Sequence, residues 1–97
     1  MLLHIGGDLG IPLTRVLFVL NEKGMTPQTR AYVDKAKKER RYIRCGAKPK
    51  CYVAVKEYGR EVLYESMIAS STLEKRWRDE IARKYLNDAA VLTITDA

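Results

Sequence analysis

The sequence has little of what catalytic and metal sites are built from. Its 97 residues include one histidine and two cysteines. A zinc site needs four ligands, mostly of these two types, so no metal site is expected. No nucleophile stands beside a general base. Gly6-Gly7 is the only glycine pair, and it lacks the spacing of a phosphate-binding loop. We therefore expect a protein that is not an enzyme, with no catalytic residue, no cofactor and no small-molecule substrate.

Long hydrophobic runs are also missing. The longest apolar run, residues 16–20, has five residues, whereas a helix needs about 20 to cross a bilayer. The apolar start at residues 1–5 has no basic region before it and breaks at Gly6-Gly7-Asp8, which argues against a secretory signal. A chain of 97 residues is the size of one domain, and without a secretory signal we expect it in the cytoplasm, not bound to a membrane. In this reducing compartment we expect Cys45 and Cys51 to be small strand residues rather than a disulfide.

Positive charge is abundant, and it is concentrated in one segment. The chain carries 18 lysines and arginines against 12 acids, a net charge of +6. Residues 35–50 contain eight of the basic residues and one acid, Glu39, whereas the rest of the chain has ten basic and eleven acidic residues. Such concentration is typical of a surface that binds a polyanion. A solvated helix end followed by a basic loop has the same composition, so this alternative stays open.

Short apolar runs bounded by turn residues predict a small twisted antiparallel sheet. A first strand is expected at residues 2–5. A second strand has Pro12 near its start and contains residues 16–20, with Arg15 just before this run. Residues 16–20 are apolar at every position, which is typical of a strand that is buried on both faces or covered by a partner subunit.

A basic hairpin is the next expected feature. Residues 42–45 and 51–55 have strand character, and residues 46–49 read as the turn between them. Lys48 and Lys50 then lie at the tip of this hairpin. Residues 61–65 add a third strand, which predicts an antiparallel meander.

Two helices complete the expected α+β fold. Thr26-Pro27 is typical of a helix start and predicts a helix over residues 27–39 with a thin apolar face. Ser71 and Glu74 form a capping box before a second helix. Its apolar stripe consists of Leu73, Trp77, Ile81 and Tyr85, with Ala82 and Leu86 beside it. Asn87-Asp88 should end this helix, giving one domain over residues 1–88 and a C-terminal strand or tail at residues 89–97.

The basic segment supplies the candidate binding residues. Lysine and arginine contact phosphate oxygens, and the release of condensed counterions drives such binding with a steep salt dependence. Tyr42 and Tyr52 suit base stacking and sheet packing alike. Two cations from outside the basic segment, Arg15 at a strand start and Arg30 of the first helix, are candidates to join it. RNA, an anionic membrane or a role as a non-catalytic protein-interaction subunit stay open as alternatives. The residues expected to bind duplex DNA are Arg15, Arg41, Arg44, Lys48 and Lys50.

Four motifs occur in an informative order along residues 3–77. They are His4-Ile5-Gly6-Gly7-Asp8, Thr14-Arg15, Lys48-Pro49-Lys50 leading into Cys51-Tyr52-Val53, and the segment IASSTLEKR at residues 68–76. In this order and spacing the chain resembles the RemA/RemB-like extracellular matrix regulators, and the RemB-type branch more closely.

The resemblance implies a DNA-binding transcriptional regulator of biofilm-matrix genes that associates with the nucleoid in the cytoplasm. It also implies a LytTR-like fold and a ring-like homo-oligomer that wraps or bends duplex DNA. In this family, DNA contacts are associated with an arginine before the second strand, which Arg15 matches, and with an arginine pair at the hairpin. Lys48-Pro49-Lys50 stands at the position of that pair, so point charges replace bidentate contacts.

Overall fold

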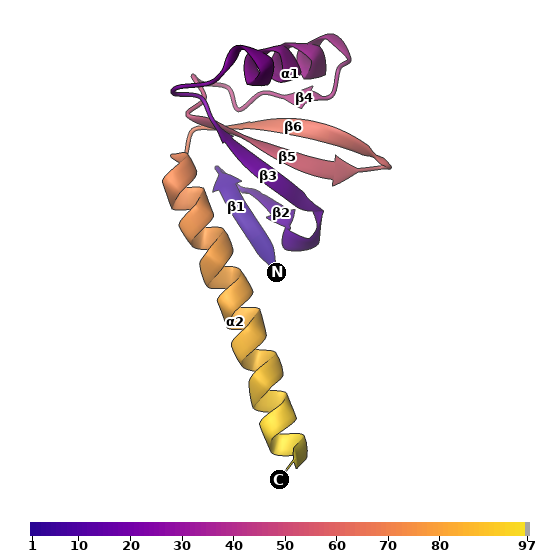
Figure 1. The fold of residues 1–97 in the computed structure, drawn as a ribbon, viewed down its shortest axis with the longest axis vertical. Helices are drawn as coiled ribbons and strands as arrows, with labels where there is room; N and C mark the ends of the chain where they lie inside the picture. Colours follow the sequence, from indigo (N-terminus) through magenta and orange to yellow (C-terminus); the bar gives the residue numbers. More distant parts are fainter. Residues whose placement is uncertain (97) are drawn as a thin grey trace.

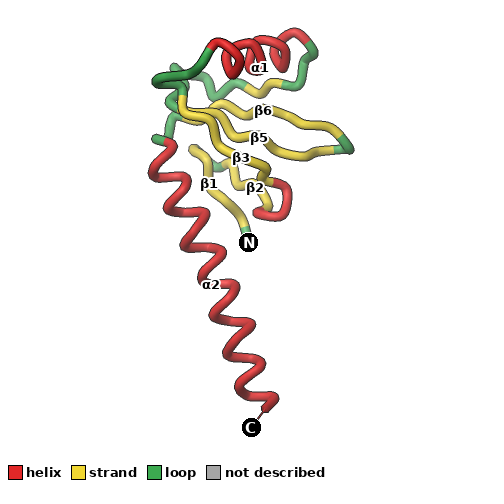
Figure 2. The backbone as a smooth tube through the Cα atoms, viewed as in Figure 1, coloured by secondary structure: helices red, strands yellow, loops and turns green. Residues whose placement is uncertain are grey.

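The computed structural model describes residues 1–96, and the side chains of residues 1–84. It confirms an α+β fold with two α-helices, and it divides the strands between two sheets (Figure 1, Figure 2). β1 and β2 form a two-stranded sheet, and the other strands form a four-stranded sheet in the order β3-β5-β6-β4. The elements are β1 (Leu2–Gly6), β2 (Leu9–Pro12), the 3₁₀ helix η1 (Leu13–Arg15), β3 (Val16–Asn21), α1 (Pro27–Lys38), β4 (Tyr42–Ile43), β5 (Cys51–Glu57), β6 (Arg60–Ser66) and α2 (Ser70–Asp96).

The N-terminal region contains one strand more than expected. β2 pairs antiparallel with β1, and the turn between them uses Gly6 and Gly7 at φ values of 129° and 55°. Side chains disfavour these angles, which explains the glycine pair. Pro12 ends β2 instead of beginning the strand that contains residues 16–20, and η1 separates the two strands. The prediction of a single strand from Pro12 onward was therefore wrong.

β3 is an edge strand with apolar side chains in the open. It pairs with β5 on one side only, and the register shifts between Val16 and Phe18. Leu17 is 38% exposed and Phe18 is 36% exposed. These exposures exclude a strand that this chain buries on both faces. The other interpretation, contact with a partner subunit, stays a prediction.

The predicted basic hairpin is not formed. β4 pairs in parallel with β6, while β5 pairs antiparallel with both β3 and β6. Both edges of β5 are occupied, so residues 42–43 join the free edge of β6 instead. The loop of residues 44–50 therefore passes across the end of β6, where the Lys50 N–H donates to the Ser66 carbonyl at 2.8 Å. Only the second half of the meander, β5 and β6, is confirmed.

The four-stranded sheet has a core on each face. Alternation along β5 sends Val53 and Val55 to one face and Tyr52 and Ala54 to the other, as the period of two residues in a strand requires. On the first face β1, β2 and α2 cover the sheet, and on the second face α1 covers it (Figure 1). The buried residues of the first core are Leu3, Ile5, Ile11, Val16, Cys51, Val53, Val55, Val62, Tyr64 and Leu73. Those of the second are Val33, Ala36, Tyr52, Ala54 and Leu63.

Helix α1 begins as its sequence predicts. The Thr26 hydroxyl accepts a hydrogen bond from the Thr29 N–H at 3.2 Å, and Pro27 occupies the first helical position. The helix ends at Lys38, one residue before the expected end. Val33 and Ala36 are its buried residues, so the apolar face is as thin as expected. Most of this helix is open to solvent.

Helix α2 is longer than expected at both ends. It begins at Ser70, and the Ala69 carbonyl accepts from the N–H groups of Thr72 and Leu73 at 3.0 and 3.1 Å. Ser71 therefore lies inside the helix, not at its N-cap. The helix also continues through Asn87-Asp88 to Asp96, because no glycine or proline interrupts residues 70–96. The alternative of a strand at the C-terminus is wrong; Ala97 lies outside the described residues.

The apolar stripe of α2 leaves the domain after two turns. Leu73 is fully buried and Trp77 packs against the first core, but Ile81 is 50% exposed. The side chains of Tyr85 and Leu86 lie outside those that the structure describes. The helix projects away from the sheets (Figure 1), which gives the molecule extents of 55 × 27 × 26 Å. Within residues 1–96 no helix has the length and hydropathy to cross a membrane.

Candidate nucleic-acid interface

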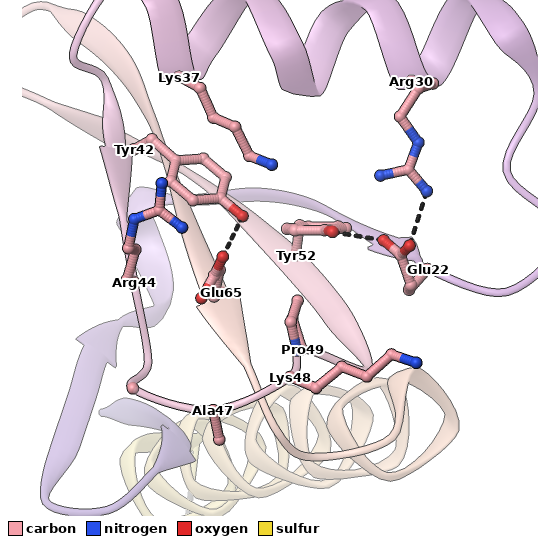
Figure 3. A pocket seen from close by; sticks show the side chains of 11 residues that line it. Glu22, Arg30, Lys37, Tyr42, Arg44, Ala47, Lys48, Pro49, Tyr52 and Glu65 are labelled. Carbon is pink, nitrogen blue, oxygen red and sulfur yellow. Dashed lines mark hydrogen bonds and ion pairs between the residues drawn. The ribbon is translucent and has the colours of Figure 1, made fainter.

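Helix α1 and the loop of residues 44–50 enclose a basic groove over β5 and β6 (Figure 3). The groove has a volume of about 510 Å³. Four cations from these two segments surround it. Its lining residues are Glu22, Arg30, Lys37, Tyr42, Arg44, Gly46, Ala47, Lys48, Pro49, Tyr52 and Glu65.

The groove brings together residues from two separate parts of the sequence. Arg30 and Lys37 are seven residues apart, two turns of α1, so they share one helix face. Arg44 and Lys48 come from the loop. Arg44 and Lys48 are expected binding residues, and Arg30 joins them as anticipated. Lys50 is exposed on the same loop but lies outside the groove.

Tyr42 lies between two of these cations. The Lys37 Nζ is 5.1 Å from the centre of the Tyr42 ring, and the Arg44 Cζ is 5.6 Å from it. Both distances are within the range of cation–π attraction. Tyr52 is only 2% exposed and belongs to the second core, so sheet packing, and not base stacking, is the role that its position supports.

Two carboxylates lie among the cations, and both are already hydrogen-bonded. Glu22 accepts from Arg30 at 2.6 Å and from the Tyr52 hydroxyl. These two hydrogen bonds, from Arg30 first, hold the pKa of Glu22 below its ordinary value. Glu65 accepts from the Tyr42 hydroxyl and from the Cys45 N–H, the latter at 3.1 Å. Burial, followed by the hydrogen bond of the Tyr42 hydroxyl to Glu65, raises the pKa of Tyr42 above its ordinary value.

Two of the expected binding residues lie elsewhere. The Arg41 guanidinium donates to Glu39 at 2.6 and 3.0 Å and to the Glu61 carbonyl at 2.8 Å, so its donors are largely engaged within the chain. Arg15 is exposed at the end of η1. Because Val16 pairs with Val55 and Asn21 with Cys51, Arg15 and the basic loop lie at opposite ends of β5.

The sequence reasoning missed a set of tyrosine–glutamate pairs. Each of four tyrosines donates its hydroxyl to a glutamate from another element or a distant position. The pairs are Tyr32–Glu61, Tyr42–Glu65, Tyr52–Glu22 and Tyr64–Glu57. Alternation along β6 was the available signal for two of them, since it places Glu61 and Glu65 on the face toward α1.

These pairs make the fold sensitive to alkaline pH. Burial, followed by the glutamate bond, raises the pKa of Tyr32 and of Tyr64 to about 12. In the unfolded chain tyrosine titrates near 10. The folded state therefore keeps these protons longer, and the free energy of unfolding is expected to fall as pH rises from about 10 to about 12. Urea unfolding at several pH values measures this fall.

The double variant Tyr32→Phe/Tyr64→Phe supplies the comparison. Without the two titrating hydroxyls, its free energy of unfolding should depend less on pH over this window. Tyr58→Phe is the matched control, because Tyr58 is almost fully exposed. An equally steep fall in the double variant would contradict the assignment.

Comparisons with known proteins give no family. No protein-family model matches the sequence, and no curated protein is significantly similar to it. Among the described residues, no three or more His, Cys, Asp or Glu side chains are grouped so as to hold a metal ion. The resemblance to the RemA/RemB-like regulators stays a prediction.

Proposed function

We propose that this protein is a DNA-binding transcriptional regulator of extracellular matrix genes and acts without catalysis. The observation that carries the proposal is the set of exposed lysine and arginine side chains on the loop of residues 44–50. Among the side chains of residues 1–84, Arg44, Lys48 and Lys50 form no ion pair, and all three are exposed. They are therefore available to phosphate oxygens. The motif resemblance supplies the gene class, a LytTR-like fold and a cytoplasmic, nucleoid-associated location.

Arg15 would provide a second contact point. Arg15 and the loop are separated by at least four residue-to-residue rises along β5, from Cys51 to Val55, a distance of about 13 Å or more. One copy therefore offers phosphates a main contact at the loop and a separate one at η1. Arg41 donates hydrogen bonds to the Glu39 carboxylate and to the Glu61 carbonyl of β6. Its role in this proposal is to hold the start of the loop in place rather than to contact DNA directly.

A homo-oligomer suits such a small contact surface. Among the described residues β3 has a strand partner on one edge only, and Leu17 and Phe18 of this strand are exposed. Edges of this kind accept another strand or another subunit. Linking several copies in a ring would multiply a weak contact through avidity.

The salt dependence of duplex DNA binding tests the proposal. If Arg44, Lys48 and Lys50 each contact one phosphate, log K should fall against log salt with a slope of about −2.7 for each bound subunit. Fluorescence anisotropy of a labelled duplex measures the slope, and light scattering gives the mass of the free protein. A monomer at micromolar concentration would contradict the ring.

Three outcomes would contradict the DNA assignment. A folded oligomer that binds no duplex DNA at low salt would indicate a protein-interaction subunit. Tighter binding to RNA than to DNA of matched length would indicate an RNA partner. Tighter binding to vesicles containing anionic lipid would indicate a membrane surface. Each probe is compared at the same ionic strength, because all of these contacts are screened by salt.

A further inference from the structure

The groove between α1 and the basic loop has the size of a small-molecule site. Its volume of about 510 Å³ falls within the roughly 300–1,000 Å³ typical of ligand pockets. The walls come from α1, the loop and the strands β4, β5 and β6, with Glu22 after β3.

The charges of the groove favour an anion. Four cations line it, namely Arg30, Lys37, Arg44 and Lys48, against the carboxylates Glu22 and Glu65. Both carboxylates are occupied by hydrogen bonds from tyrosines, from Arg30 and from a backbone N–H. Within residues 1–84, by contrast, Lys37, Arg44 and Lys48 form no ion pair. Four cations against two carboxylates leave the lining with a net charge of +2, which favours an anion.

The cations are distributed along the groove, not gathered at one point. Lys37 and Arg44 lie beside the Tyr42 ring, at 5.1 and 5.6 Å from its centre. Arg30 lies on the other side with Glu22, and the Lys48 side chain extends toward that side (Figure 3). A single small anion would meet one group of charges. An extended anion of several linked negative groups would meet both.

The fixed geometry favours this ligand further. The Tyr42 ring is held by its bond to Glu65, and Arg30 is held by Glu22 at 2.6 Å. Side chains that are already positioned lose less conformational entropy when a ligand binds. We propose that this groove binds a small ligand with two or more linked phosphates, of the nucleoside polyphosphate or inorganic polyphosphate type. The site does not depend on whether the protein also binds duplex DNA.

Calorimetric titration at low salt with inorganic tripolyphosphate and, separately, with ATP tests the proposal. Both probes should bind, and Lys37→Met or Arg44→Met should each weaken tripolyphosphate binding by about tenfold or more, because each removes a charge-assisted contact. Lys38→Met is the matched control: it is the next residue of α1, it is exposed, and it lies outside the groove. Its affinity should stay within about twofold of the unchanged protein. Equal affinity for both probes assigns recognition to the phosphates alone, whereas tighter ATP binding adds the nucleoside.

Two results of these titrations would overturn the proposal. One is the absence of binding for both probes at millimolar concentration. The other is equal weakening by Lys38→Met, which would show that only the general positive field matters.

A third arm uses duplex DNA with the Lys37→Met variant. Loss of tripolyphosphate binding with nearly unchanged duplex affinity supports a small-ligand site that uses Lys37, which the proposed DNA contact does not. An equal loss of both would make the groove part of the DNA contact and overturn the proposal. Tripolyphosphate binding by a protein that binds no duplex would contradict only the proposed DNA function.

Discussion

Replacing both Lys48 and Lys50 with glutamate is expected to weaken duplex DNA binding by about 100-fold or more. A hydrogen bond to a charged group contributes about 1.5–3 kcal/mol, and tenfold in affinity corresponds to about 1.4 kcal/mol. Two lost contacts therefore exceed this factor before the new repulsion is counted. Fluorescence anisotropy at one fixed salt concentration measures the change.

The fold should survive this double substitution. Both side chains are exposed, and the Lys50 contact that holds the loop to β6 is made by its backbone N–H. The matched control is Lys56→Glu/Arg60→Glu, which changes the net charge by the same amount at the exposed far end of β5 and β6. If the two double variants lose equal affinity, net charge and not the loop determines binding. Unchanged affinity in Lys48→Glu/Lys50→Glu would contradict the assignment of DNA binding to the loop.

Leu73→Ala is expected to lower the free energy of unfolding by about 2–5 kcal/mol, the usual cost of such a substitution in a core. Leu73 is 0% exposed and belongs to the core that joins β1, β2 and α2 to the sheet. Its loss leaves a cavity at the point where the projecting helix is anchored. Urea unfolding followed by circular dichroism measures the difference.

Ile81→Ala is the matched control on the same helix. Ile81 lies two turns further along and is half exposed, so its substitution should change the free energy of unfolding by about 0.5 kcal/mol or less. A loss as large as that of Leu73→Ala, at a protein concentration where oligomers form, would show that a partner covers Ile81. A small effect of Leu73→Ala would contradict the described packing of α2.

Features fixed by neighbouring residues were predictable from the sequence. Thr26-Pro27 begins α1 through a local cap, and alternation along β5 assigns its side chains to the two faces. Strand pairing was not predictable in the same way. Residues 42–43 were expected to pair with β5. That edge of β5 is occupied by β3, which lies at least thirty residues before β5 in the chain. The local pattern of a hairpin carries no information about such a distant competitor.

The same limit applies to the candidate site. Arg44 and Lys48 were identified because charge is concentrated around them in the sequence. Whether a cation is free depends on contacts that the sequence does not show: Arg41 is engaged by Glu39 and by Glu61, twenty residues away. Lys37 belongs to the site only because α1 and the loop line the same groove.

The parallel pairing of β4 has a consequence for the order of folding. β4 has two residues, and its only strand partner among the described residues is β6, which follows it in the chain. During synthesis, residues 42–43 therefore have no edge to join until β5 and β6 have formed their hairpin. A nascent chain thus does not display the charges of the basic loop in their final arrangement until β6 is complete.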